Sequence, residues 1–237
     1  MYLYLLINVL SIILPLIFSF AGKEKFKYEW KPLFAGIAIM AFIFIPWDIY
    51  FTGNGVWGFN NRYITGIKYF HLPLEEWLFF ICIPYASLFI HFIIATYLPT
   101  INLNKQTTRY LAVIQILICF LIAISNTEKL YTFYVLTLTS LLTFMSVIFA
   151  FSVLQRFYIS FLFILIPFLI VNGVLTGSFI EGEVVWYNDF HNLGIRIFTI
   201  PVEDSMYAFS MLLIPAIMME KAKTFKKSGW SMKSLII

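Results

Sequence analysis

Seven stretches without Asp, Glu, Lys or Arg dominate this chain and constrain its fold more than any other feature. They are residues 1–22, 32–47, 77–104, 110–127, 130–155 and 157–180, and a shorter one at 205–219. A hydrocarbon layer of roughly 30 Å needs about 20 apolar residues per helix. Only 12% of the residues are charged, about half the ~25% of soluble domains. These observations exclude a soluble globular enzyme.

The apolar stretches are predicted to be helices, because backbone groups in lipid need partners within their own segment and the stretches lack the alternation of barrel strands. We predict an all-α integral membrane protein with seven transmembrane helices, near residues 2–20, 32–50, 73–97, 108–125, 130–151, 157–176 and 200–219. The first is interpreted as a retained helix rather than a secretory signal, since its lysines follow the apolar run.

Basic residues predict the orientation. Seven crossings place the segments 21–31, 98–109, 152–156 and 220–237 on one side of the membrane. Twelve Lys or Arg residues fall on that side and four on the other. The positive-inside rule then predicts a multi-pass protein of the cell membrane, with its N-terminus outside and its C-terminus in the cytoplasm. These loops also explain the net charge of +4, so no nucleic-acid partner is expected. Cys82 and Cys119 lie in apolar helices and predict neither a disulfide nor a metal site.

An internal repeat relates the two halves of the chain. GIKYFHLPLEE at 66–76 matches GIRIFTIPVED at 194–204 at five of eleven positions, and DIYFTG at 48–53 resembles NGVLTG at 172–177. An offset of four helices is even, so both copies cross the membrane in the same direction. We therefore predict two parallel three-helix repeats, approximately 1–97 and 130–219, joined by helix 108–125. Both acidic motifs then lie near the outer face.

The acidic motifs are the main candidates for chemistry. Proline suits the first turn of a helix, so Pro73 and Pro201 are expected to begin two helices and to place the acids in their first turns. Carboxylates there are also stabilised by the helix dipole alone. Two copies at the edge of the hydrocarbon, where charge is costly, favour a functional site. The catalytic candidates are Glu75, Glu76, Glu203 and Asp204.

Carboxyl groups placed close together resist losing all their protons, so this cluster could act as a Brønsted acid facing an apolar cavity. Aromatic faces near it could stabilise a carbocation, although aromatic residues also populate membrane interfaces. The candidate substrate-binding or supporting residues are Asp48, Asn172, Trp47, Trp57, Trp77, Tyr63, Trp186 and Tyr187. No His or Cys accompanies the acids at ligand spacing, and no nucleotide motif is present, so neither a metal nor a cofactor is expected.

Four segments carry a family resemblance: PWDIYFTGNGVW (46–57), FHLPLEEWLFF (70–80), NGVLTG (172–177) and IPVEDSMYAF (200–209). They resemble the membrane lycopene cyclases of the heterodimeric type. The chain looks like the fused single-chain form, related to the cyclase domain of fungal bifunctional phytoene synthase/lycopene cyclase. The resemblance implies a lycopene beta-cyclase of carotenoid biosynthesis, an intramolecular lyase or isomerase. It would cyclise the ψ ends of lycopene to β-rings by acid catalysis without a cofactor, giving γ-carotene and then β-carotene.

The family motif falls on the four acids named above, and Glu75 and Glu203 are the favoured principal pair, with the acid and the base unassigned. The expected partners are lycopene or a related polyene and the lipid bilayer, and either a monomer or a homo-oligomer is compatible with the motifs. Two alternatives stay open. One is a cyclase of a C50 or other carotenoid, and the other is a non-enzymatic seven-helix sensor or transporter that binds an ion or a proton.

Overall fold

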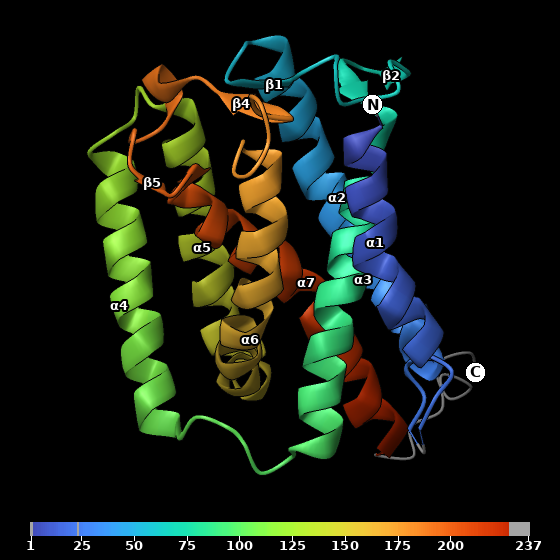
Figure 1. Ribbon diagram of the computed structural model, residues 1–237. Helices are drawn as coiled ribbons and strands as arrows, with labels where there is room; N and C mark the ends of the chain where they lie inside the picture. Colours follow the sequence, from blue (N-terminus) through green and yellow to red (C-terminus); the bar gives the residue numbers. More distant parts are fainter. Residues whose placement is uncertain (1, 23, 228–237) are drawn as a thin grey trace, which may run out of the picture.

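The computed structural model describes residues 2–22 and 24–227, which form seven α-helices (Figure 1). The helices are α1 (Leu3–Phe18), α2 (Trp30–Gly53), α3 (Leu74–Tyr97), α4 (Lys105–Ile124), α5 (Leu130–Phe149), α6 (Phe151–Leu175) and α7 (Glu203–Lys227). The 3₁₀ turn η1 (Phe26–Glu29) precedes α2, and a second one, η2 (Asp189–His191), follows strand β4 (Val185–Tyr187). The predicted all-α character of the bundle is confirmed.

Five helices of the described chain, α2 to α6, are long and apolar enough to cross a membrane. Helix α1 is apolar but has only 16 residues, so seven crossings remain a prediction. Large apolar side chains such as Phe42, Leu162 and Ile170 are exposed on the outside of the bundle. Apolar side chains on this surface are what a helix bundle embedded in lipid requires.

Two helix boundaries differ from the sequence prediction. Helix α6 begins at Phe151 rather than near residue 157, and α7 covers 203–227 rather than 200–219. The polar residues that suggested these ends have partners inside the bundle. Gln155 Nε2 donates to a backbone carbonyl of the α3–α4 connection at 2.7 Å, and Arg156 Nη1 lies 3.1 Å from Glu220 Oε2. Because their hydrogen bonds are made within the protein, these residues do not end a helix.

Helix packing divides the bundle into α1–α3 on one side and α4–α6 on the other, with α7 between them (Figure 1). Helices α2 and α7 approach each other closely. A Cβ atom added at Gly36 would lie 2.5 Å from Cα of Pro215, so only glycine allows these two backbones to pack so closely. His91 of α3 also hydrogen-bonds Ser160 of α6 at 2.8 Å.

Short strands cover one end of the bundle (Figure 1). Strand β1 (Trp57–Phe59) pairs antiparallel with β4, with Gly58 opposite Trp186. This pairing joins the connection between α2 and α3 to the connection between α6 and α7. A Cβ atom at Gly58 would lie 2.3 Å from the Trp186 ring, so glycine at this position lets the ring pack directly on the backbone of β1.

Two matching hairpins lead into α3 and α7. Strand β2 (Lys68–Tyr69) pairs with β3 (Leu72–Pro73), and β5 (Arg196–Ile197) pairs with β6 (Ile200–Pro201). Each hairpin begins shortly after a glycine with positive φ, +87° at Gly66 and +70° at Gly194. As expected, the prolines mark the two helix starts, and the acids that follow them lie in the first turns of α3 and α7. The prolines themselves lie one or two residues before the helices, in strands β3 and β6. Pairing with β2 and β5 holds them extended, so each helix begins after its proline.

Candidate active site

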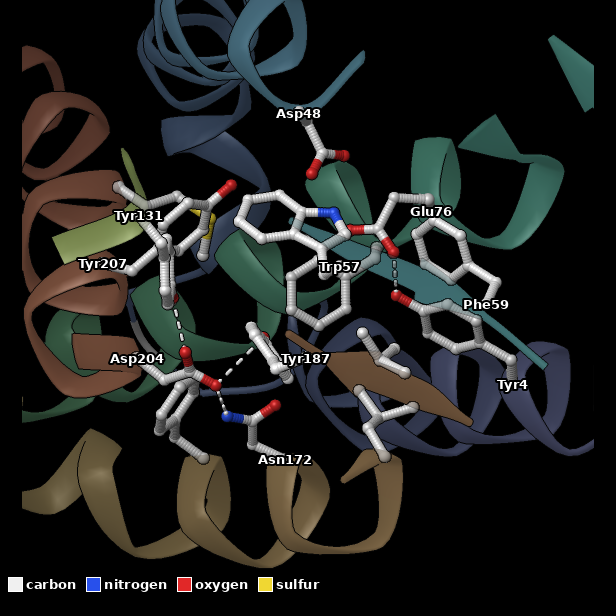
Figure 2. A pocket seen from close by; sticks show the side chains of 15 residues that line it. Tyr4, Asp48, Trp57, Phe59, Glu76, Tyr131, Asn172, Tyr187, Asp204 and Tyr207 are labelled. Atoms are coloured by element: carbon white, nitrogen blue, oxygen red, sulfur yellow. Dashed lines mark hydrogen bonds between the residues drawn. The ribbon is translucent and has the colours of Figure 1, made fainter. Parts of the chain in front are cut away.

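A buried cavity of about 50 Å³ lies at the helix ends beneath β1 and β4 (Figure 2). Six helices and both strands contribute to its wall. The lining residues are Tyr4, Asp48, Trp57, Phe59, Glu76, Phe79, Tyr131, Phe168, Asn172, Leu175, Val185, Tyr187, Asp204, Tyr207 and Met211. Three of them are carboxylic acids, eight are aromatic, and none is Lys, Arg or His. A carboxyl group here therefore has no cationic partner among the lining side chains.

Two of the carboxyl groups lie on one side of the cavity (Figure 2). Glu76, 8% exposed, accepts a hydrogen bond from the hydroxyl of Tyr4 through Oε2 at 2.5 Å. Asp48 of α2 is 2% exposed and hydrogen-bonds the side chain of Trp57. Its Oδ2 atom has no hydrogen-bond partner among the residues that the structure describes. This side holds two acids and few donors.

The third carboxyl group, Asp204 of α7, lies on the opposite side and is surrounded by donors (Figure 2). Its Oδ2 atom accepts hydrogen bonds from Asn172 Nδ2 at 2.7 Å and from the hydroxyl of Tyr187 at 3.1 Å. The hydroxyl of Tyr131 donates to Oδ1. Burial, together with the neighbouring Asp204, raises the pKa of Tyr187 well above its ordinary value, so this hydroxyl stays a donor at neutral pH.

The neighbouring acids Glu75 and Glu203 do not line the cavity. Glu75 Oε1 accepts the backbone N–H of Thr65 at 2.6 Å, and Glu203 Oε1 accepts that of Leu193 at 2.8 Å. Thr132 of α5 also donates to Glu203 Oε1, at 2.6 Å. Both acids thus hold the loops that precede α3 and α7 against the helix ends. The expected principal pair, Glu75 and Glu203, is placed outside the cavity, and the other member of each motif faces into it.

Of the predicted supporting residues, Asp48, Asn172, Trp57 and Tyr187 line the cavity. The other four lie elsewhere. Trp47 is partly exposed on α2, where its ring packs on Tyr134 at a centroid distance of 4.4 Å. Trp77 is partly buried, Trp186 packs over Gly58, and Tyr63 donates to the carbonyl of Glu181 at 2.6 Å.

Tyr4, Tyr131 and Tyr207 contribute to the cavity and are absent from the sequence-based candidates. Tyr4 and Tyr131 are each the second residue of their helices, in the matching segments LYLL and LYTF. Extending the internal repeat to the first helix of each half would have found this pair.

In the described part of the chain, no group of three or more His, Cys, Asp or Glu side chains is arranged to hold a metal ion.

Comparison with known proteins identifies the family. The family model of lycopene cyclases matches two stretches of the chain, residues 1–94 and 128–222. The chain therefore belongs to the lycopene cyclase family. It is 33% identical over 108 residues to the bifunctional lycopene cyclase/phytoene synthase of the fungus Phycomyces blakesleeanus. That alignment covers 42% of this chain and only 18% of the fungal protein. No solved structure matches the chain.

Proposed function

We propose that this protein is a lycopene beta-cyclase, which converts the ψ ends of lycopene to β-rings by acid catalysis without a cofactor. The observation that carries the proposal is a buried, aromatic-walled cavity with three carboxyl groups and no cationic side chain in its lining. Such a site suits a reaction in which an acid protonates an apolar substrate. Family membership and the name of the fungal relative support the same reaction.

In this proposal Glu76 is the proton donor. Asp48 and Glu76 share one side of the cavity, and close carboxyl groups without a cation cannot all be ionised. A buried ionised carboxylate without a partner is also costly. Glu76 accepts one hydrogen bond, from Tyr4, so its environment does little to stabilise a negative charge. A protonated Glu76 would then face the substrate, with Asp48 as its neighbour.

Asp204 is the proposed base. Three donors, on Tyr131, Asn172 and Tyr187, point at its two oxygens. Hydrogen bonds donated to a carboxylate favour its charged form. The two sides of the cavity therefore suit opposite roles, one that supplies a proton and one that accepts it.

The reaction needs no other reactant. Glu76 donates a proton to the terminal double bond of the ψ end, which leaves a tertiary carbocation. The internal double bond attacks this cation, closes a six-membered ring and moves the positive charge to a ring carbon. Asp204, or a water molecule that it holds, removes a proton from the neighbouring carbon to form the ring double bond. One proton enters and one leaves, so the product is an isomer. The faces of Trp57 and Tyr207 can stabilise the intermediate cations.

We also propose that residues 1–97 and 130–219 are two copies of one three-helix unit, joined by α4. The family model matches each half separately. The backbone bonds Leu74 N to Ile67 O and Val202 N to Ile195 O, 2.9 and 3.0 Å long, occupy equivalent places in the two hairpins. Tyrosines at equivalent places, Tyr4 and Tyr131, donate to the cavity acids. For orientation we propose an outer N-terminus and a cytoplasmic C-terminus.

Expression of the chain in bacteria that accumulate lycopene, followed by chromatography of the pigments, tests the function. The wild type and the variant Glu128→Gln, which changes an exposed acid outside the cavity, should produce γ- and β-carotene. Glu76→Gln and Asp204→Asn should leave lycopene unchanged at equal protein levels. If all four proteins leave lycopene untouched, the same strains supplied with an acyclic C50 carotenoid distinguish another cyclase from a chain without cyclase activity.

A further inference from the structure

A second hollow, of about 250 Å³, lies between α1, α3 and α6. It is largely apolar. Its lining residues are Leu10, Ser11, Leu14, Pro15, Phe79, Ile83, Ala86, Ser87, Ile90, Pro167, Phe168, Val171 and Asn172. The hydroxyl of Ser11 already donates to the carbonyl of Ile7 at 2.8 Å. The surface thus suits a hydrocarbon, and its volume exceeds the roughly 150 Å³ of an engineered cavity that binds benzene.

This hollow is a groove open to the outside of the bundle. Leu14 and Pro167 at its rim are exposed, with Leu14 59% accessible. Phe79 and Phe168 at its floor are 9% and 8% accessible. On α3 the lining extends from Phe79 to Ile90, about 16 Å at 1.5 Å per residue. Because α3 is one of the helices apolar enough to span a membrane, the groove opens where lipid chains would surround the protein.

The groove and the acid cavity share part of their walls. Phe79, Phe168 and Asn172 line both. Asn172 donates to Asp204 at 2.7 Å, so the inner end of the groove lies one residue from the proposed base. The acid cavity itself holds only about 50 Å³, less than the roughly 150 Å³ that held benzene. Movement of the two phenylalanine rings would join the two spaces and give room for a ring.

In the proposed repeat, α2 corresponds to α6 and α7 corresponds to α3. The contact between α2 and α7 is therefore the equivalent of the α3–α6 side, but it is packed differently. Phe44 precedes Asp48 by four residues, as Phe168 precedes Asn172, and Tyr207 follows Asp204 by three, as Phe79 follows Glu76. The rings of Phe44 and Tyr207 pack edge to face with centroids 5.1 Å apart. Close backbone packing at Gly36 draws these helices together. The α2–α7 contact is therefore closed by side chains, whereas the α3–α6 contact carries the groove.

We propose that this groove binds the straight polyene chain of the substrate, and that Phe79 and Phe168 form a gate through which the end of the polyene reaches the acids. The proposal rests on the proposed function, because it assigns the occupant from the cyclisation site to which the groove leads. A linear hydrocarbon can enter sideways from the bilayer, lie along α3 and present its ψ end to Glu76 and Asp204. Once one end is cyclised, the molecule leaves by the same groove and returns with its other end.

Filling the groove tests this proposal. Ala86→Trp fills the groove between Phe79 and Ile90 of α3, and Leu14→Trp narrows its exposed rim with little risk to folding. Ile170→Trp is the matched control, since Ile170 is exposed on α6 and outside the groove. We expect at least a tenfold lower cyclisation rate for Ala86→Trp, a severalfold lower rate for Leu14→Trp, and a rate within twofold of wild type for the control.

Retention of substrate separates binding from turnover. Each substitution is combined with Glu76→Gln, and the lycopene that remains bound after purification in detergent is measured by its visible absorption. We expect at least tenfold less lycopene per protein with Ala86→Trp than with Ile170→Trp. If both groove variants retain as much lycopene as the Ile170→Trp control, the proposal is overturned and the groove is assigned to a lipid acyl chain. If the wild type forms no cyclic product but lycopene retention still falls with Ala86→Trp, the groove stands and the proposed function fails.

Discussion

The two acids of the first motif are adjacent, and the structure predicts that replacing each by glutamine has different consequences. Glu75→Gln changes a side chain that accepts the N–H of Thr65 at 2.6 Å. The amide oxygen of Gln can accept the same hydrogen bond, so only its charge assistance is lost. Hydrogen bonds to charged groups contribute about 1.5–3 kcal/mol and neutral ones about 0.5–1.5 kcal/mol. We therefore expect Glu75→Gln to cost roughly 1 kcal/mol of stability.

Glu76→Gln should do the reverse. Its amide oxygen can still accept from the hydroxyl of Tyr4, so the protein should unfold at nearly the same temperature. The proposed proton donor, however, is gone. General acid catalysis contributes about 10²–10⁴-fold in rate, so the initial rate of cyclisation should fall by at least about 100-fold. Glu75→Gln should stay within about fivefold of wild type, because its carboxyl group does not line the cavity.

Initial rates in proteoliposomes containing lycopene, with thermal unfolding of the same samples in detergent, measure both effects. Glu203→Gln and Asp204→Asn repeat the comparison in the second motif, where Glu203 binds the N–H of Leu193. An active Glu76→Gln variant beside an inactive but equally stable Glu75→Gln variant would refute our assignment. The acid outside the cavity would then be the one that reacts.

Three further predictions follow from the geometry. Tyr187→Phe removes one hydrogen-bond donor to the proposed base. Loss of this bond should cost about 1 kcal/mol, which corresponds to a roughly fivefold lower cyclisation rate, and an unchanged rate would contradict the role of Tyr187. Gly36→Val forces side-chain atoms into a backbone 2.5 Å away and should cost about 1–3 kcal/mol; thermal unfolding should show no such loss for Gly53→Ala, whose nearest neighbour is 3.8 Å away. In a background with both native cysteines replaced, Phe179→Cys should react with an impermeant maleimide in intact cells and Lys105→Cys only after permeabilisation; the opposite result would reverse the proposed orientation.

Much of the fold follows from hydrophobicity and repeat patterns. Charge-free stretches are enough to predict helices, because lipid leaves the backbone no other partners. Helix ends are less predictable, since Arg156 and Glu220 look like loop residues until their 3.1 Å contact is known. The strand that contains Pro73 was also hidden, because it consists of two residues paired with two others. So short a hairpin has no periodicity to detect.

The composition of the site was more predictable than its geometry. The paired motifs drew attention to four acids, but their first members looked as suitable as their second members. Adjacent residues on a helix point about 100° apart, so one of each pair faces the cavity and the other the loop. Which one does so depends on the angle at which the hairpin enters the helix, and this is a tertiary property. Tyr4 was missed because a tyrosine near a membrane interface has an ordinary explanation.

Differences between the two halves matter most for the proposed chemistry. Acid–base catalysis by two carboxyl groups needs one neutral and one charged at the same time, and different surroundings decide which group holds the proton. The two halves differ beside these groups, since Asp48 lies near Glu76, whereas at the equivalent position Asn172 donates to Asp204 at 2.7 Å. A second acid favours retention of a proton, whereas an amide donor favours its loss. In the proposed mechanism, this difference between the halves therefore favours Glu76 as the proton donor and Asp204 as the acceptor.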